Sequence, residues 1–197
     1  TRIEELSDSK ISIDLFAAGE KVSALETLDA LQAGDADLSH GTAYYWTSRS
    51  PSFALFATVP FGMMASEHQS WLAFGGGQAL WDTVGERFGV KPFPVGNTGV
   101  QSAGWFREPI RTRRDLEGKV VRFPALGGEL FRAVGAVPRL TSGAEIGPML
   151  QSGDLDGAEW VSPWVDLQYG MQNYCRYCYY PGVHEPGHTM EMNIALP

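Results

Sequence analysis

The sequence has few positive charges and no long apolar run. It carries 15 Lys and Arg residues against 23 Asp and Glu, which gives a formal net charge of −8 over 197 residues. Binding to nucleic-acid phosphates needs clustered basic side chains, so this balance excludes the usual electrostatics of a nucleic-acid-binding protein. No stretch reaches the ~18 consecutive apolar residues of a transmembrane helix, and residues 1–10 are too polar for a targeting segment. We therefore expect a chain that neither spans a membrane nor carries a signal peptide.

Motifs of hydrolases and nucleotide-binding enzymes are absent as well. The sequence has no Gly-x-Ser-x-Gly elbow, no His-Glu-x-x-His and no P-loop. The glycines at 75–77 lack the Gly-Lys-Ser/Thr ending of a phosphate loop, so a helix break or close packing explains them better. Serine, histidine and aspartate are all present, but nothing favours a catalytic triad.

Cysteine is scarce. Cys175 and Cys178 are the two cysteines, in a Cys-x-x-Cys spacing followed by His184 and His188. Such a pair is compatible with a redox couple, half of a metal site, a local disulfide or two packed thiols. Only five residues separate Cys178 from His184, against about twelve in a zinc finger. We favour packed thiols in an aromatic strand or loop and assign the pair no function.

The composition supports a folded core, because 44% of the residues are hydrophobic and 12% are aromatic. Alternating or β-rich patterns predict strands at 11–16, 37–45, 90–95, 119–123 and 136–140. Helical spacing predicts a helix from Ser23 to Leu31, two helices within 66–88 separated by the glycines at 75–77, a turn at 115–118, and helices at 129–134 and 144–150. This alternation indicates an α/β fold with a mainly parallel sheet in each lobe.

A short internal repeat supports two lobes. Residues 31–37 read Leu-Gln-Ala-Gly-Asp-Ala-Asp and residues 150–156 read Leu-Gln-Ser-Gly-Asp-Leu-Asp. Both have a helix end, a glycine that stops it and an Asp-x-Asp entry into a strand. The two copies are too far apart for a solenoid, so we interpret them as one helix–glycine–strand unit in each lobe.

Arg122 is the first candidate for binding chemistry, because it lies in an otherwise apolar strand just before Pro124. A guanidinium at a strand end can hold a carboxylate through two parallel hydrogen bonds, at the edge where α/β proteins bind ligands. An exposed strand arginine, or one paired with Glu129, fits the pattern equally well.

Two acidic residues are further candidates. Glu159 lies beside Trp160 at the end of an expected strand, and Glu185 follows in a loop rich in proline and glycine. Glu159 could bind a hard cation and Trp160 could form the wall of an apolar pocket. A solvated charge at Glu185 and core packing of Trp160 remain open from the pattern alone.

Ordered motifs along nearly the whole chain resemble a known family. They include Gly-Asn-Thr-Gly-Val-Gln at 96–101, Asp-Leu-Glu-Gly-Lys-Val-Val-Arg-Phe-Pro at 115–124, Gly-Ala-Glu-Trp at 157–160, Tyr-Tyr-Pro-Gly at 179–182, Gly-Thr-Ala-Tyr-Tyr-Trp at 41–46 and Thr-Val-Pro-Phe-Gly at 58–62. The sequence thereby resembles the solute-binding proteins of tripartite ATP-independent periplasmic (TRAP) transporters, and within them the branch that binds α-keto acids and related monocarboxylates.

The resemblance implies a two-lobed, periplasmic-binding-protein-like fold of type II, lacking terminal elements. Lobe I would comprise residues 1–98, lobe II residues 99–188, and residues 189–197 would return toward lobe I. Relatives begin earlier and continue further, so the resemblance implies that this chain is a piece of a longer protein. It also implies a periplasmic receptor and not an enzyme, with TRAP membrane subunits as partners and a possible homodimer in the full-length form.

By resemblance, Arg122 is the arginine that holds the ligand carboxylate. A sodium or calcium ion would bridge to the ligand, and the resemblance implies these metal-binding residues: Gln101, Glu159, Trp160 through its backbone carbonyl, and Glu185. The Trp160 ring and Gln101 would also contact the ligand, with Asn97, Tyr44 and Tyr45 as weaker ligand contacts. The implied ligand is a small 2-oxo or 2-hydroxy acid such as pyruvate or lactate.

Two departures from the family pattern bear on ligand identity. Residues 162–164 read Ser-Pro-Trp where relatives often have Gly-Pro-Tyr, and His184 replaces a common tryptophan. A larger or aromatic carboxylate is therefore the alternative ligand. A metal-dependent enzyme that uses Glu159, Glu185 and His184 is the alternative from another functional class.

Overall fold

The computed structural model describes residues 2–183 and 187–197. Its α-helices are α1 (Arg2–Leu6), α2 (Thr27–Ala33), α3 (Phe53–Ala57), α4 (Ala65–Phe74), α5 (Gly77–Glu86), α6 (Ala125–Ala133), α7 (Gly143–Ser152) and α8 (Pro163–Tyr169). Short 3-10 helices are η1 (Ala43–Trp46), η2 (Arg113–Leu116) and η3 (Met171–Asn173). The strands are β1 (Leu38–Gly41), β2 (Val90–Asn97), β3 (Gly104–Phe106), β4 (Val120–Arg122), β5 (Val137–Arg139), β6 (Gly157–Ala158), β7 (Tyr177–Tyr179) and β8 (Thr189–Ala195).

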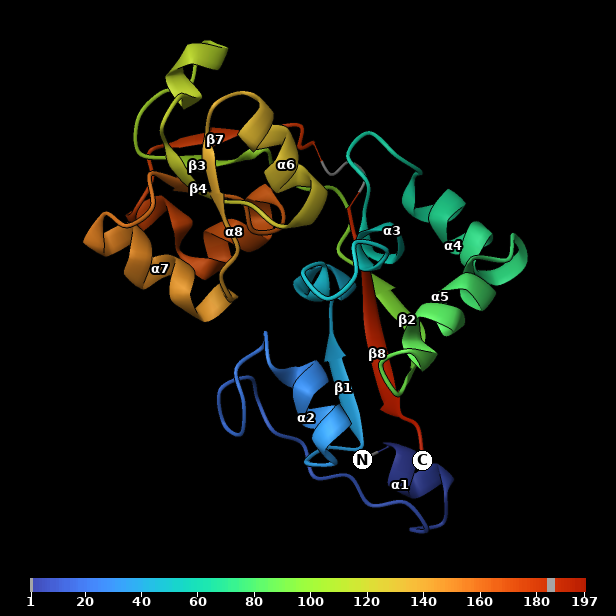
Figure 1. Cartoon of the computed structure of the whole chain (residues 1–197). Helices are drawn as coiled ribbons and strands as arrows, with labels where there is room; N and C mark the ends of the chain where they lie inside the picture. Colours follow the sequence, from blue (N-terminus) through green and yellow to red (C-terminus); the bar gives the residue numbers. More distant parts are fainter. Residues whose placement is uncertain (1, 184–186) are drawn as a thin grey trace.

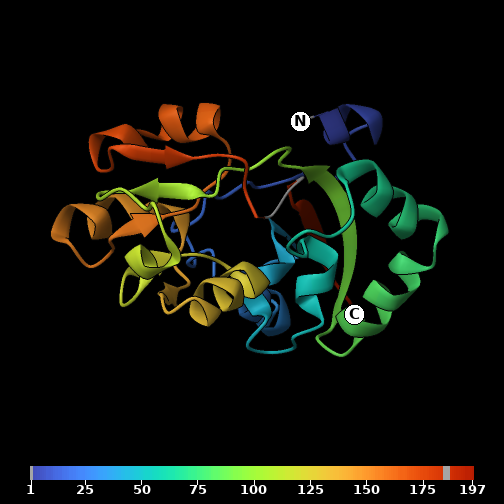
Figure 2. The same ribbon diagram turned by 90° about the horizontal axis from the view of Figure 1, so that it is seen from above.

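These elements form two bodies, each built on one sheet (Figures 1 and 2). The three-stranded body has the strand order β1-β8-β2 and carries α2 to α5. The five-stranded body has the order β5-β4-β6-β3-β7 and carries α6 to α8. Helices and sheets are therefore mixed in both bodies, as the α/β expectation required.

The expectation of mainly parallel sheets is wrong for the three-stranded body and only partly right for the five-stranded one. β8 runs antiparallel to both β1 and β2, while β4 runs parallel to β5 and β6, and β3 antiparallel to β6 and β7. The antiparallel pairing arises because the chain crosses between the bodies before it forms β3 and β8. β8 starts beside the end of β2, at the pair Asn97 and Thr189, so it must run back along β2. Pro92 and Pro94 are tolerated in β2 because it is an edge strand.

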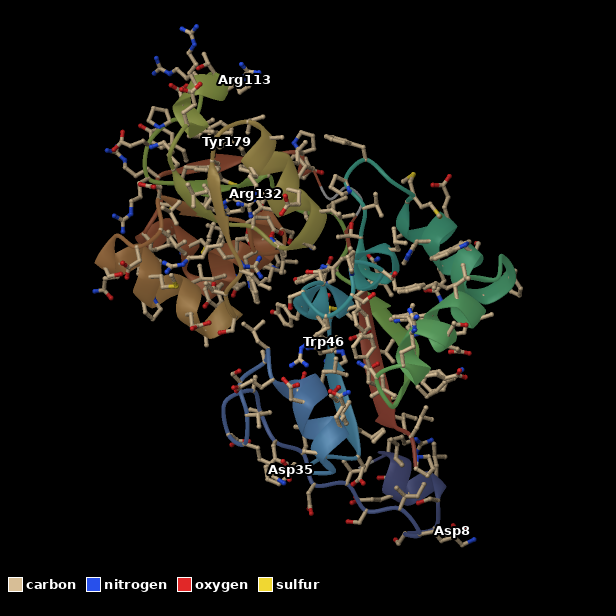
Figure 3. All side chains as sticks on the ribbon, viewed as in Figure 1. Asp8, Asp35, Trp46, Arg113, Arg132 and Tyr179 are labelled. Carbon is tan, nitrogen blue, oxygen red and sulfur yellow. The ribbon has the colours of Figure 1, made fainter. Side chains whose placement is uncertain are left out.

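Each body has its own apolar core. The three-stranded body buries aromatic side chains of η1, α3 and α5, among them Trp46, Phe56 and Trp81; Trp46 is marked in Figure 3. In the five-stranded body, the adjacent residues Trp105 and Phe106 belong to different clusters. Because neighbouring residues of a strand point to opposite faces, both faces of this sheet are covered.

Several local expectations are confirmed. Two helices flank the glycines at 75–77, and both copies of the internal repeat end a helix at a left-handed glycine, Gly34 with φ 77° and Gly153 with φ 89°. Glycine adopts this conformation without a steric penalty. Ser23 does hydrogen-bond the Glu26 carboxylate, at 2.7 Å, but α2 begins only at Thr27.

The strand expected at residues 11–16 is wrong. This segment has no regular structure, and large side chains such as Leu15 and Phe16 are exposed. The alternation of apolar residues defines two faces of a strand, but a strand needs a pairing edge, and no described strand pairs with this segment.

Two crossover segments connect the bodies. Residues 98–103 lead from β2 to β3, and residues 180–188 lead back from β7 to β8. The described residues of these segments run side by side, because Thr98 N–H donates to the His188 carbonyl at 3.0 Å and Ala103 N–H to the Tyr179 carbonyl at 2.7 Å. The candidate site described next lies around these segments.

Candidate ligand-binding site

Arg122, the last residue of β4, is completely buried, with 0% of its surface exposed. Its Nη1 donates to the backbone carbonyl of Glu159 at 2.8 Å and to Glu159 Oε2 at 2.9 Å. The guanidinium carbon lies 5.3 Å from the centre of the Trp160 ring. Both alternatives left open for Arg122 are therefore wrong, because it is not exposed and Glu129 pairs with Arg132 instead.

The other edge of this guanidinium carries two further donors, and the Tyr44 and Tyr45 hydroxyls also interact with the group. Arg122 Nε and Nη2 are buried and have no hydrogen-bond partner among the described residues. These two N–H groups lie on the same edge of the planar group, opposite the Nη1 that holds Glu159. A carboxylate matches this fork with two parallel hydrogen bonds. A ligand there would also remove the cost of burying two unsatisfied donors.

Glu159 follows β6 directly and is 1% exposed. Its N–H donates to the Arg122 carbonyl at 3.0 Å, which aligns the two residues on neighbouring strands. Burial raises the pKa of Glu159 to about 8; the Arg122 charge opposes this rise and the Asp166 charge adds to it. A cation beside Glu159 would favour its charged form.

Tyr44 and Tyr45, from the three-stranded body, interact with Arg122 and Glu159 of the other body. Their rings, from η1, meet edge to face with centres 5.1 Å apart. Burial raises the pKa of both phenols, and the positive charge of Arg122 partly offsets this effect. Since the two tyrosines belong to one body and Arg122 to the other, the candidate site is formed by both.

Gln101 lies in the first crossover and is buried. Its Nε2 donates to Thr98 Oγ1 at 2.8 Å and lies 3.0 Å from Nδ1 of His188. The next residue, Ser102, donates its N–H to the Val161 carbonyl at 2.8 Å, so the chain at Gln101 runs beside the chain at Trp160. Three of the four expected metal-binding residues thus lie on adjacent segments.

The fourth, Glu185, lies outside the described residues. The glycines on either side are tightly packed: a Cβ on Gly182 would be 2.5 Å from the Gln101 carbonyl oxygen, and one on Gly187 would be 1.9 Å from that of Gly99. Only glycine fits such contacts, so both ends of this loop lie against the first crossover.

The available donor atoms suit a hard cation. Gln101, Glu159 and the Trp160 carbonyl offer oxygen atoms, the donors that sodium and calcium prefer. Within residues 2–183 and 187–197, no three His, Cys, Asp or Glu side chains gather as a metal-binding group. Cys175 is buried in the core and Cys178 is exposed on β7, each as a free thiol.

Asn97 is placed differently from the other expected ligand contacts. It is exposed at the end of β2, and its Oδ1 accepts from the Gly99 N–H at 2.8 Å. It lines a cavity of about 240 Å³ in the three-stranded body together with Leu55, His68 and Trp71. Arg122 and Glu159 do not line this cavity, and the role of Asn97 as a ligand contact stays a prediction.

Asp166, in α8, is a residue that the sequence analysis missed. Its buried carboxylate accepts from Ser102 Oγ at 2.8 Å, Trp105 Nε1 at 2.9 Å and Val161 N–H at 2.9 Å. It thereby ties the segment after Gln101 to the segment after Trp160. An aspartate in the first turn of a helix is common, so no pattern in the sequence indicated this role.

Asp166→Asn is expected to destabilise the fold by about 2–3 kcal/mol, because the amide has one acceptor oxygen for three buried donors and turns its NH2 toward one of them. Chemical denaturation measures the loss. Asp154→Asn is the matched control, since Asp154 is exposed and accepts only from Ser152. Equal stability of both variants would contradict the anchoring role.

A family model described as bacterial extracellular solute-binding protein, family 7, matches residues 1–194. The chain belongs to this family. The resemblance to TRAP solute-binding proteins is thereby confirmed, and family 7 is a family of transport proteins that bind solutes, not of enzymes. None of the described helices is long and apolar enough to cross a membrane.

Three relatives of this family 7 chain are informative. A monocarboxylate 2-oxoacid-binding periplasmic protein from Nostoc sp. is 39% identical over 99% of the chain and 54% of its own length. A TRAP solute-binding protein from Pseudoalteromonas atlantica, solved with sodium and pyruvate, is 36% identical with a TM-score of 0.94, over 98% of this chain and 58% of that one. A TRAP solute-binding protein from Bordetella bronchiseptica, a dimer with copurified calcium and picolinate, is 28% identical with a TM-score of 0.94, over 98% of this chain and 58% of that one. The chain thus spans little more than half the length of these relatives.

Proposed function

We propose that this family 7 chain is part of a periplasmic receptor of a TRAP transporter that binds a small 2-oxo or 2-hydroxy carboxylate, such as pyruvate or lactate. The buried edge of Arg122, whose Nε and Nη2 have no close hydrogen-bond partner among the described residues, carries the proposal. A burial cost of this kind is recovered when a carboxylate occupies the fork. The 2-oxoacid-binding relative from Nostoc and the pyruvate-bound relative from Pseudoalteromonas support the ligand class.

A sodium or calcium ion is the proposed second partner of the ligand. Gln101, Glu159, the Trp160 carbonyl and Glu185 would hold it. Bound there, the ion supplies positive charge that lets two glutamates lie near an anionic ligand. Arg122 holds the ligand carboxylate, the Trp160 ring forms an apolar wall, and Tyr44 and Tyr45 close the site from the other body.

The two bodies correspond in this proposal to the lobes of a binding protein. Lobe I is residues 1–98, lobe II residues 99–188, and residues 189–197 return to lobe I as β8. Closure of the lobes would bury the ligand between them, so its affinity would include the difference in free energy between open and closed states. The partners would be the membrane subunits of the transporter, and the Bordetella relative supports a homodimer.

Titration calorimetry with pyruvate, lactate and picolinate tests the function. Binding is expected with pyruvate or lactate in sodium or calcium buffer and is expected to weaken at least tenfold in potassium buffer with a chelator. Unchanged affinity without either ion would refute the cation, and conversion of the acid into a product would refute a receptor. Strong binding of picolinate alone would favour the aromatic alternative, for which the Bordetella relative is the precedent.

Glu159→Gln should raise the cation concentration needed for half-maximal binding at least tenfold, because it removes an anionic oxygen while keeping an acceptor for Arg122. Glu129→Gln is the control, since Glu129 is exposed and pairs with Arg132. The same cation requirement in Glu159→Gln and wild type would contradict a role of Glu159 at the ion.

A further inference from the structure

His188 lies where the two crossovers meet and contacts residues of the proposed site on two sides. Its ring packs edge to face against Tyr44, with ring centres 5.1 Å apart, and its Nδ1 lies 3.0 Å from Gln101 Nε2. The residue is buried, with 5% of its surface exposed. In the sequence, His188 stands out only through its place after the two cysteines, so neither its position nor these contacts were expected.

Thr98 determines which end of the Gln101 carboxamide faces this corner. Thr98 Oγ1 accepts from the His188 backbone N–H at 3.0 Å and lies 2.8 Å from the Gln101 carboxamide. Its single hydrogen has an acceptor in the Gly99 carbonyl at 3.4 Å or in His188 Nδ1 at 3.4 Å. When the Thr98 hydroxyl donates its hydrogen to one of these acceptors, its oxygen can only accept from Gln101. The NH2 end of the Gln101 carboxamide therefore faces Thr98.

With the carboxamide in this orientation, the second hydrogen of the NH2 can be donated to His188 Nδ1, 3.0 Å away. Nδ1 accepts only in the neutral tautomer that carries its proton on Nε2. Two acceptors therefore hold the NH2, and the carboxamide oxygen Oε1 is turned the other way. The opposite orientation would place the NH2 dipole toward a cation and repel it.

We propose that His188 is a positioning residue that orients the Gln101 carboxamide so that its oxygen binds the cation. This inference rests on the proposed function, because it assumes that Gln101 is a metal ligand. Residues that hydrogen-bond a metal-binding side chain fix its orientation and contribute strongly to metal affinity.

Two variants separate orientation from packing. His188→Leu removes the acceptor, whereas His188→Asn keeps an oxygen near the position of Nδ1. Calorimetry with pyruvate over a calcium series is expected to show at least a tenfold higher half-saturating calcium concentration for His188→Leu, and a change below threefold for His188→Asn. Equal losses in both variants, or no loss in His188→Leu, would overturn the proposal.

A double-mutant cycle with Gln101→Glu tests the same point without depending on the shape of residue 188. A carboxylate has two equivalent oxygens and no wrong end, so H188L should cost less than threefold in the Q101E background. A full tenfold cost there would show that His188 acts only through packing.

A spectroscopic measurement keeps the inference independent of ligand binding. Long-range ¹H–¹⁵N spectra of the wild type distinguish an accepting Nδ1 from a protonated one. The proton is expected on Nε2, and a proton on Nδ1 would overturn the orientation of Gln101. If wild type shows the expected tautomer but binds no carboxylate in any buffer, the proposed function fails while the orienting contact stands.

Discussion

Replacing Arg122 by alanine is expected to weaken binding of any carboxylate ligand at least ~30-fold. The loss of a buried, charge-assisted pair typically costs about 2–5 kcal/mol, and each 1.4 kcal/mol is about a factor of ten in affinity. Calorimetry with pyruvate in calcium buffer measures the effect. Retained affinity would refute the assignment of the carboxylate to the Nε and Nη2 edge of Arg122.

A second variant separates loss of binding from loss of stability, because Arg122→Ala leaves Glu159 buried without its counter-charge and destabilises the fold. Arg122→Lys keeps a positive charge beside Glu159 but cannot form the two-pronged contact. It is expected to melt near the wild-type temperature and still to bind at least tenfold more weakly. Arg132→Ala is the matched control: Arg132, labelled in Figure 3, lies in α6, is exposed and pairs with Glu129 at 3.2 Å. Its affinity should equal that of wild type.

The second large effect is expected at Glu191, in the middle of β8. Glu191 is fully buried between Gly41 of β1 and Pro94 of β2. Its Oε1 accepts from Asn193 at 2.9 Å, and its Oε2 has no hydrogen-bond partner among the described residues. Burial raises the pKa of Glu191 from 4.5 to about 8, so the folded protein holds this proton at neutral pH.

The sign of the pH dependence follows from proton uptake. Between pH 4.5 and about 8 the folded state binds one more proton at Glu191 than the unfolded state does, so the free energy of unfolding must fall as pH rises. The full window corresponds to roughly 5 kcal/mol at most. Below pH 4.5 both states are protonated and this contribution is complete.

Glu191→Gln should remove this part of the pH dependence. Denaturation at pH 5, 7 and 9 is expected to show a wild type that loses stability with rising pH and a variant that loses less, so that the variant is relatively most stable at pH 9. Glu159 titrates in both proteins and cancels in the comparison. Glu86→Gln, at an exposed carboxylate of α5, should follow wild type. Parallel curves for wild type and Glu191→Gln would contradict a buried neutral acid.

Local features of the fold could be predicted from the sequence because they depend on neighbours in the chain. Gly34 and Gly153 end helices through their own backbone conformation, and the glycines at 75–77 interrupt a helix for the same kind of reason. Strand direction could not be predicted, since it depends on where β8 and β3 enter after crossing between bodies. The failed strand at 11–16 has the same origin, because pairing requires a distant edge.

The candidate site shows the same division. Arg122 and Glu159 were recognisable because a charge within an apolar strand end is unusual. Their mutual hydrogen bonds were not foreseen, since they link strands 37 residues apart. Asp166 and His188 had no usable signal, because each acts on side chains far away in the sequence, and the cavity that Asn97 lines was not foreseen either.

The strand order β1-β8-β2 also constrains how the chain can fold. β1 and β2 pair with β8 and not with each other, and β8 is made of residues 189–195. During synthesis from the N-terminus, both outer strands are therefore present long before the strand that joins them. The three-stranded sheet cannot be completed until the five-stranded body has been synthesised, because β8 follows that body in the chain. Its folding therefore depends on contacts between residues about 90 to 155 positions apart.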